Sequence, residues 1–315
     1  MKMRIERFNP VIHTDIWNSF LAKAKNSLFM FNRSFMEYHS DRFHDHSLLF
    51  FEEGRLIALL PANEKERVLF SHSGLTFGGI ITDQAMKAPK MLAIFDTLKD
   101  YLKTQNFKKL MYKAIPYIYH TIPAQEDLYA LFYNNAKCYR YDLTTTIDLT
   151  QPISFSERRR RGIKKAQKSG IIVEESSDLK SYFLILSSLL QEKYNKAPVH
   201  NLNEIELLAS RFPENIKLYA AFKEEIMIAG VLIFEYQQTV HTQYIGSSHE
   251  GKQLHALDLV FYDLITKYYI HKKYFDFGIS TEEEGMYLNH GLITQKEEFG
   301  GRAVVHQFFG LDINV

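Results

Sequence analysis

Apolar and polar residues follow one another along the chain in an order that occurs twice. From Ile226 to Glu235 both alternating faces are apolar, which is typical of a central strand covered on both sides. After a polar turn, a second strand is predicted from Val240 to Ile245, and a loop of small residues follows it. Apolar residues then recur at helical spacing, at Leu257, Val260, Phe261, Leu264, Ile265 and Tyr268.

The first half repeats this order. Leu48 to Leu60 predicts a hairpin with a Glu-Gly turn, and Val68 to Ser71 predicts a further strand. A loop of small residues then leads to a helical stripe from Met91 to Leu102. Other helices are predicted at Asp15–Lys25, Ser34–Tyr38, Leu179–Glu192 and Leu202–Arg211.

Short segments of the two halves also match in sequence. Phe51–Ala58 resembles Phe222–Ala229, and residues 106–116 occupy the same place after a helix as residues 270–280. The alternative to a duplication is chance similarity between two amphipathic hairpins. We expect an α/β protein with mixed α+β sheets in two tandem domains, residues 1–150 and 151–315, divided after a strand that ends at Pro152.

Composition and charge exclude several classes of protein. Of 315 residues, 46% are hydrophobic, so the chain is globular rather than disordered. The 38 basic and 37 acidic side chains nearly cancel, so no global field favours nucleic acid or an anionic membrane. Cys138 is the one cysteine and the N-terminus lacks an apolar signal core, which predicts a cytoplasmic protein without stable membrane insertion. The 13 histidines show no metal-ligand spacing, so no metal is expected.

The loop after the second strand favours a bound anion. Small residues between a strand and a helix leave backbone N–H groups that can bind a diphosphate. The predicted donor-binding residues are Ile245, Ser247, Ser248, Gly251, Lys252, Gln253 and Leu254.

A strongly basic helix is predicted near the start of the second half, between Ser156 and Gly170. Arg158, Arg161 and Lys165 share one side of it, and Arg159 lies roughly opposite with the apolar residues. One interpretation is a solvated helix. The other is a clamp on an anionic substrate, a coenzyme phosphate or a tRNA backbone, with Arg158, Arg161 and Lys165 as substrate-binding residues.

Three segments resemble the FemABX-like branch of the GNAT acyltransferases. They are the basic segment 155–173, the strand Tyr-Phe-Asp-Phe-Gly at 274–278, and the segment Gly-Leu-Ile-Thr-Gln-Lys-Glu-Glu-Phe-Gly-Gly at 291–301. The resemblance implies two GNAT-type domains, with the motifs in the second. It also implies transfer of an aminoacyl group from tRNA to a cell-wall precursor, or of an acyl group from coenzyme A to an amine.

Two departures from the family affect the choice of donor. The chain lacks the long coiled-coil arm of the peptidoglycan enzymes, which favours an acyl-CoA donor over tRNA. Its phosphate loop keeps only Gly251 and Ala256 of the usual GNAT pattern.

Acyl transfer needs a polarised carbonyl, a deprotonated amine and a protonated leaving group. The resemblance places Lys296 near the transferred group. His241 is a candidate base and Tyr244 a candidate acid; three residues apart on one strand, they are expected on opposite faces. Asn289 lies in a polar loop at the open end of the sheet, and Asp276 is expected to anchor strand ends.

The predicted function is transfer from acetyl-CoA or another acyl-CoA to the amine of a small, anionic acceptor. Two alternatives remain open. One is an aminoacyl-tRNA-dependent transferase acting on a cell-wall precursor, and the other is a non-catalytic binding protein on a duplicated GNAT fold. The oligomeric state is left open.

Overall fold

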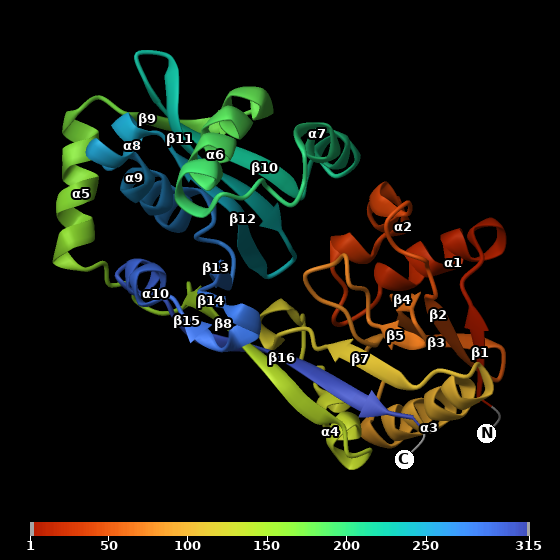
Figure 1. The fold of residues 1–315 in the computed structure, drawn as a ribbon. Helices are drawn as coiled ribbons and strands as arrows, with labels where there is room; N and C mark the ends of the chain where they lie inside the picture. The colour runs from red at the N-terminus through yellow and green to blue at the C-terminus, as the bar shows by residue number, and fades with distance from the viewer. Residues whose placement is uncertain (1–2, 314–315) are drawn as a thin grey trace. The chain divides into compact units, whose positions relative to one another are not determined.

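The computed structural model describes residues 3–313, apart from the side chain of Tyr194. The chain forms two compact units (Figure 1). Unit 1 comprises Met1–Asp142, Glu283–Met286 and Val305–Val315, and unit 2 comprises Leu143–Glu282 and Tyr287–Val304.

Unit 1 combines two sets of strands with helices. One sheet has the order β1 (Met3–Arg7), β2 (Leu48–Glu52), β3 (Arg55–Leu60), β6 (Ile81–Thr82). The second set runs β4 (Asn63–Lys65), β5 (Val68–Phe70), β7 (Lys109–Lys113), β16 (Arg302–Asp312). The helices and short helical turns are α1 (Pro10–Leu21), η1 (Phe29–Phe31), α2 (Arg33–Met36), η2 (Glu37–His39), α3 (Ala88–Thr104), η3 (Tyr117–Tyr119) and α4 (Glu126–Tyr133).

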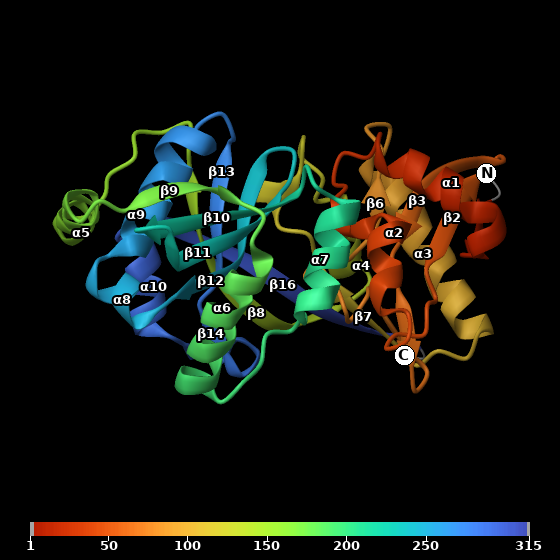
Figure 2. The same ribbon diagram turned by 90° about the horizontal axis from the view of Figure 1, so that it is seen from above.

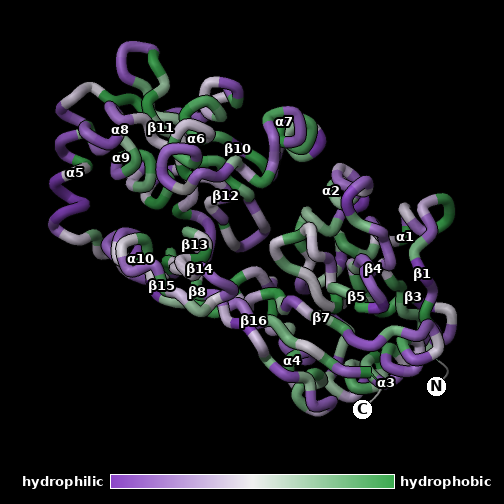
Figure 3. The backbone as a smooth tube through the Cα atoms, viewed as in Figure 1, coloured by the Kyte–Doolittle hydropathy of each residue, from purple (hydrophilic) through white to green (hydrophobic). Residues whose placement is uncertain are grey.

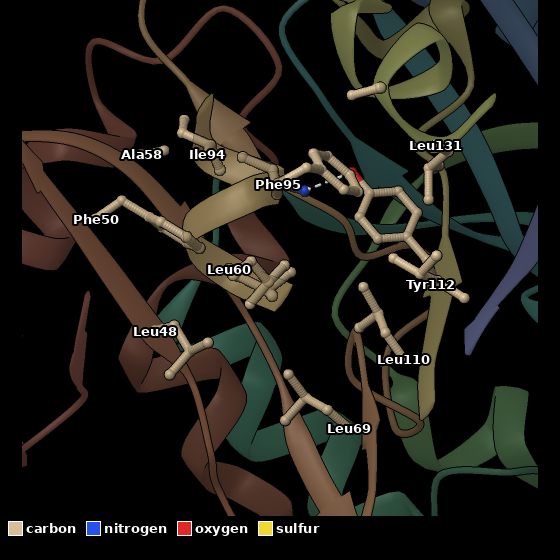
Figure 4. Packing of buried hydrophobic residues seen from close by; sticks show 14 of the residues in the cluster. Leu48, Phe50, Ala58, Leu60, Leu69, Ile94, Phe95, Leu110, Tyr112 and Leu131 are labelled. Atoms are coloured by element: carbon tan, nitrogen blue, oxygen red, sulfur yellow. Dashed lines mark hydrogen bonds between the residues drawn. The ribbon is translucent and has the colours of Figure 1, made fainter. Parts of the chain in front are cut away.

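The core of unit 1 lies between these strands and α3 (Figure 4). Phe95 and Leu98, from the predicted helical stripe, are fully buried in it. The buried hydroxyl of Tyr112 accepts from the N–H of Ile80 at 2.7 Å and donates to Asp127 at 2.6 Å. Helix α1 begins earlier than predicted because Asn9 caps it and Pro10 occupies its first turn.

In unit 2 the strand order is β9 (Ile172–Ser176), β10 (Ile216–Lys223), β11 (Ile226–Glu235), β12 (Thr239–Ser247), β13 (Tyr274–Ile279), β8 (Lys137–Asp148). The helices are α5 (Glu157–Lys168), α6 (Leu179–Tyr194), α7 (Leu202–Arg211), α8 (His249–Gln253), α9 (Ala256–Asp263) with a π-helical turn η4 (Leu264–Tyr268), and α10 (His290–Glu297). A small hairpin joins β14 (Thr281–Glu282) to β15 (Tyr287–Leu288) through the turn η5 (Glu283–Gly285).

Helices cover both faces of the unit 2 strands, as the all-apolar pattern of β11 predicts (Figure 2). Tyr182 of α6 packs over Gly230 and Gly246, which are opposite each other on β11 and β12. The intervening residues, such as Val231 and Ile233, face the other way and share a core with α9. A side chain at Gly230 would collide with the Tyr182 ring, since its Cβ would lie 2.8 Å from Cδ2.

Each half of the sequence contributes its last strand to the unit built mainly from the other half. Residues 143–148 of β8 belong to unit 2, where they pair antiparallel with β13. Strand β16 belongs to unit 1 from Val305 on, and there it pairs antiparallel with β7. The domains predicted from the sequence meet at residue 150, whereas the chain passes from unit 1 to unit 2 within β8, between Asp142 and Leu143.

The two hairpins that match in sequence also match in backbone detail. Each turn has two residues in the left-handed region, Glu53 and Gly54 in one and Glu224 and Glu225 in the other, as tight hairpin turns of the primed type require. Each pair of strands also carries a bulge at the same aligned position, at Ile57 and at Ile228. These shared irregularities support a duplicated fold.

Candidate functional site

The site of unit 2 lies where two parallel strands separate. Strands β12 and β13 pair only from Thr239 to His241 and from Tyr274 to Asp276. Beyond this point β12 continues along β11 to Ser247, whereas β13, which pairs with β8 along its other edge, continues to Ile279. Such a break at the carboxyl ends of strands is a usual place for a ligand in an open α/β sheet.

Two adjoining cavities occupy this region of unit 2. Cavity A has a volume of about 550 Å³ and cavity B one of about 480 Å³. Four residues line both: Ser247, Lys252, Leu257 and Gln295. The two cavities therefore provide neighbouring compartments for one elongated ligand.

Cavity A is polar and cationic. It is lined by Arg158 and Arg159 of α5, Ser247, Gly251, Lys252, His255, Leu257, Asp258, and His290, Gly291, Thr294 and Gln295 of α10. Three of these side chains carry a permanent positive charge and one carries a carboxylate. The cavity thus favours an anionic group.

The predicted donor loop forms the wall between the cavities. Ser248 caps α8 by accepting from the N–H of Gly251 at 3.1 Å. A Cβ at Gly251 would lie 2.3 Å from the carbonyl oxygen of Ile228, so only glycine allows α8 to sit this close to β11. Ser247, Gly251 and Lys252 line cavity A, and Ile245 lines cavity B.

Arg159 is a buried cation at the base of cavity A. Its guanidinium lies 2.6 Å from Asp258 Oδ1 and 2.8 Å from Glu298 Oε2, and it stacks over the Phe299 ring at 4.8 Å. Asp258 also lies 3.0 Å from His255 Nδ1. The sequence placed Arg159 on the inner side of the helix but gave no signal for its partners, which are remote in the chain.

Cavity B is mainly apolar. Its walls come from α6, β12, α9, β13 and α10, with Ile245, Leu189, Leu190, Leu257, Phe261, Phe277, Leu292 and Phe299 as the apolar lining. Lys193, Lys252, Gln295 and Lys296 are among its polar lining residues. The cavity suits a thin, largely apolar ligand segment with one reactive polar end.

Lys296 is the buried charge of cavity B, with 5% of its surface exposed. Its Nζ donates to the carbonyl oxygens of Gly278 and Ile279 at 2.8 and 2.7 Å. Burial lowers the pKa of Lys296 to about 8, against the opposing effect of Asp276. The structure buries this lysine although two glutamates, Glu297 and Glu298, follow it in the sequence.

A second titratable group reaches the same glycine. His241 Nδ1 lies 2.8 Å from Asp276 Oδ2, and Asp276 also accepts from Thr144 and Thr146 on β8. A Cβ at Gly278, whose φ is +75°, would lie 3.3 Å from Cε1 of the His241 ring. The imidazole and the Lys296 ammonium therefore approach Gly278 from its α-carbon and its carbonyl.

A family model matches part of the chain. Residues 154–284 match the model of the acetyltransferase (GNAT) domain. This part of the chain is similar to a GNAT acetyltransferase domain. A sequence search of curated proteins finds no match.

Several solved structures match this chain in fold over nearly its whole length. FemX is 13% identical with a TM-score of 0.71, and the match covers 98% of both chains. L-PGS from Bacillus licheniformis is 13% identical with a TM-score of 0.60, over 98% of this chain and 94% of that one. A tandem GNAT protein from the clavulanic acid biosynthesis pathway is 10% identical with a TM-score of 0.54, over 100% and 99%. At these identities the likeness shows the fold.

A bulge in the GNAT strand β12 reverses one expectation. Leu232 pairs with Tyr244 and Ile233 with Thr242, so Gln243 is an extra residue. His241 pairs with Phe234, which shares a face with Leu232, and His241 and Tyr244 therefore lie on the same face. The prediction of opposite faces was wrong because simple alternation ignores the bulge.

Other predicted residues do not line either cavity. Burial raises the pKa of Tyr244, whose hydroxyl accepts from the N–H of His200 and lies 2.7 Å from its Nδ1. Asn289 caps α10 through Leu292 and donates to Glu282. The cavity linings also omit His241, Ser248, Gln253, Leu254, Arg161 and Lys165.

The described residues contain no group of three or more His, Cys, Asp or Glu side chains that could hold a metal ion. Within residues 3–313 no helix is both long and apolar enough to cross a membrane.

Proposed function

We propose that this GNAT protein transfers an acyl group from a coenzyme A thioester to the amine of a small acceptor. One observation carries the proposal: a cationic cavity and an apolar cavity share a wall, and a buried lysine lines the apolar one. A coenzyme thioester has the same order of parts, with phosphates at one end of a thin arm and the acyl group at the other.

The phosphates of the donor fit cavity A. Arg158, Arg159 and Lys252 supply positive charge there, and Asp258 and Glu298 hold the Arg159 guanidinium in place. The thioester arm then runs along Ser247 and Leu257 into cavity B. Arg158 shares this cavity with the donor loop, so we assign it to the donor rather than to the acceptor.

Lys296 stabilises the charge that develops on the acyl oxygen. The reaction forms a C–N bond and breaks the C–S bond through a tetrahedral oxyanion. In its ammonium form Lys296 has three N–H groups, two of which donate to Gly278 and Ile279. The third remains for the oxyanion, in a largely apolar cavity where such a contact is strong.

The His241–Asp276 pair is the proposed base. Asp276 holds Nδ1 of the imidazole, which fixes the ring over Gly278. The base takes a proton from the attacking amine, and the departing thiolate takes up a proton as the C–S bond breaks.

The acceptor is assigned by its reacting amine. A small anionic amine was expected from Arg158, Arg161 and Lys165 as one group. The structure separates them: Arg158 lines cavity A, whereas Arg161 and Lys165 are exposed and line neither cavity. We keep the amine as the acceptor and assign it no charge.

Isothermal calorimetry with acetyl-CoA tests the donor. We expect binding that Arg159→Met weakens by at least about tenfold, since loss of a charge-assisted contact typically removes 1.5 to 3 kcal/mol. Lys180→Met, which removes an exposed lysine outside both cavities, is the control. Failure of the wild type to bind any acyl-CoA would exclude the proposal.

An aminoacyl-tRNA donor is the second candidate. The observation that favours it is the exposed basic face of α5, whose first turn reaches cavity A through Arg158. Salt-sensitive binding of aminoacyl-tRNA in the absence of acyl-CoA binding would establish this alternative.

A further inference from the structure

The outer face of α5 carries a dense positive charge that the proposed donor site does not use. Six exposed cations lie on this helix of 12 residues: Arg158, Arg160, Arg161, Lys164, Lys165 and Lys168. Among the described residues, two ion pairs involve these cations: Arg160 with Glu157 at 2.9 Å and Arg158 with Glu298 at 3.7 Å. In both views α5 lies on the outer side of α9 (Figures 1 and 2), and its tube is mainly hydrophilic (Figure 3).

This arrangement is unfavourable for an isolated helix. Arg161, Lys164, Lys165 and Lys168 are spaced three or four residues apart, so like charges repel along one side. Arg158, Arg160 and Arg161 also lie near the helix N-terminus, where the macrodipole disfavours positive charge and only Glu157 opposes them. A local cost of this kind is typical of a surface that serves binding.

A small coenzyme cannot use this surface. Arg158 is the one exposed α5 residue in the lining of cavity A, and Arg159 is buried. The cations from Arg161 onward line neither cavity. Their partner must therefore extend beyond a molecule that fills cavity A.

We propose that the thioester donor is delivered by an acidic acyl carrier protein that docks on α5. An acidic helix of the carrier pairs with the row formed by Arg161, Lys165 and Lys168. The phosphodiester of its phosphopantetheine arm occupies cavity A, and the acyl group enters cavity B. This inference rests on the proposed function, because it assigns the source of the same thioester.

Two features favour a protein over other polyanions. The lining of cavity A contains no Phe, Tyr or Trp, the large rings on which bases stack in single-strand channels, and its only aromatic side chains are the smaller His255 and His290. The exposed residues of α5 are all charged or polar, so the helix lacks the apolar wedge with which helices bind a bilayer surface. The positive charge of α5 therefore favours a folded acidic protein as the partner.

The chemical step is the same as with the free coenzyme. The acceptor nitrogen forms a bond to the acyl carbon, and the C–S bond to the phosphopantetheine sulfur breaks. The amine loses one proton and the thiolate gains one, so the products are an amide and the free thiol of the carrier. No oxidant or further reactant is needed.

The test compares two donors that carry the same acetyl group, acetyl-CoA and an acyl carrier protein loaded with acetyl-phosphopantetheine. The variant reverses four charges outside the cavities: Arg161→Glu, Lys164→Glu, Lys165→Glu and Lys168→Glu. A matched variant reverses four exposed lysines of unit 2 outside α5: Lys180→Glu, Lys196→Glu, Lys267→Glu and Lys273→Glu.

We expect the α5 variant to lower kcat/KM for the loaded carrier by at least about tenfold and to leave kcat/KM for acetyl-CoA within about twofold. The matched variant should change neither. The carrier reaction should also slow more steeply as salt rises than the acetyl-CoA reaction.

Several results would overturn the inference. Equal effects of the α5 variant on both donors would show a general defect, and a carrier reaction unaffected by the variant would show that α5 is not the docking surface. Loss of aminoacyl-tRNA use in the α5 variant, with an inactive carrier, would make RNA the partner. If no thioester reacts with the wild type, the proposed function itself fails; turnover of acetyl-CoA alone would reject only the carrier.

Discussion

Replacing Lys296 with methionine should make the protein more stable at neutral pH and inactive. Each tenfold change in proton affinity corresponds to about 1.4 kcal/mol. Burial lowers the pKa of Lys296 from 10.5 to about 8, so keeping the ammonium charged at pH 7 costs the folded chain about 3 kcal/mol. Methionine fills the same space without the charge.

The substitution also removes two hydrogen bonds. The carbonyl oxygens of Gly278 and Ile279 lose their donor, and each lost hydrogen bond lowers the free energy of unfolding by about 1 kcal/mol. The net expectation is that Lys296→Met raises the free energy of unfolding by about 1 kcal/mol at pH 7.

This advantage should disappear as the pH rises. Between about 8 and 10.5 the unfolded chain binds more protons at this position than the folded chain, so wild-type stability increases with pH relative to the variant. The cost of the charged lysine falls to about 2 kcal/mol at pH 9 and below about 1 kcal/mol at pH 10. The two proteins should be equally stable near pH 9, and the variant should be weaker at pH 10.

Urea unfolding at pH 7, 8, 9 and 10 provides the measurement. Lys252→Met removes an exposed lysine from the lining of the same cavities, and we expect its stability to stay within about 0.5 kcal/mol of the wild type throughout. A Lys296→Met variant that is weaker than the wild type by the same amount at every pH would refute the reasoning.

Four further outcomes follow from the site. Arg158→Gln should weaken acetyl-CoA binding by about two- to fivefold, as an exposed charge contact does, while Arg161→Gln should leave it unchanged and thereby control for net charge. Arg159→Met should destabilise unit 2 by about 3 kcal/mol or more in urea unfolding, because it removes the arginine that neutralises the buried Asp258 carboxylate. Gly251→Ala should cost about 2 kcal/mol by the same assay, since its Cβ would overlap a carbonyl oxygen. His241→Gln should lower kcat by about 100-fold without changing the calorimetric affinity for acetyl-CoA.

Local sequence patterns predict the elements of this fold well because their causes are local. The repeated hairpin turns depend on residues that tolerate the left-handed region, such as Gly54, and on strands of fixed apolar alternation. The basic helix has the predicted limits because Ser156 caps it and Gly170 follows it. The donor loop was found for the same reason, since Ser247 and Gly251 are small residues between a strand and a helix.

Long-range features of the site could not be read in the same way. The partners of Arg159 are Asp258 and Glu298, and no spacing along the chain connects them. The burial of Lys296 depends on the strand end at Gly278, although the lysine is followed by two glutamates that suggest a solvated surface. The bulge at Gln243 changes which side chains share a face without leaving a compositional signal.

The strand exchange between the halves has a consequence for biosynthesis. A ribosome releases β7 with its partner edge open, and that edge stays open until residues 305–312 have emerged, after the whole of the acyl-transfer site. Unit 1 therefore starts to fold before unit 2, but its sheet is completed only after unit 2 has started to fold. Until then the exposed edge of β7 can pair with a strand of another nascent chain. By contrast, Thr144 and Thr146, whose hydroxyls donate hydrogen bonds to Asp276, are synthesised before the rest of unit 2. Unit 1 therefore cannot complete its sheet until the second half of the chain has been synthesised. A gene split at residue 150 would separate His241 and Asp276 from β8, the strand that holds Asp276.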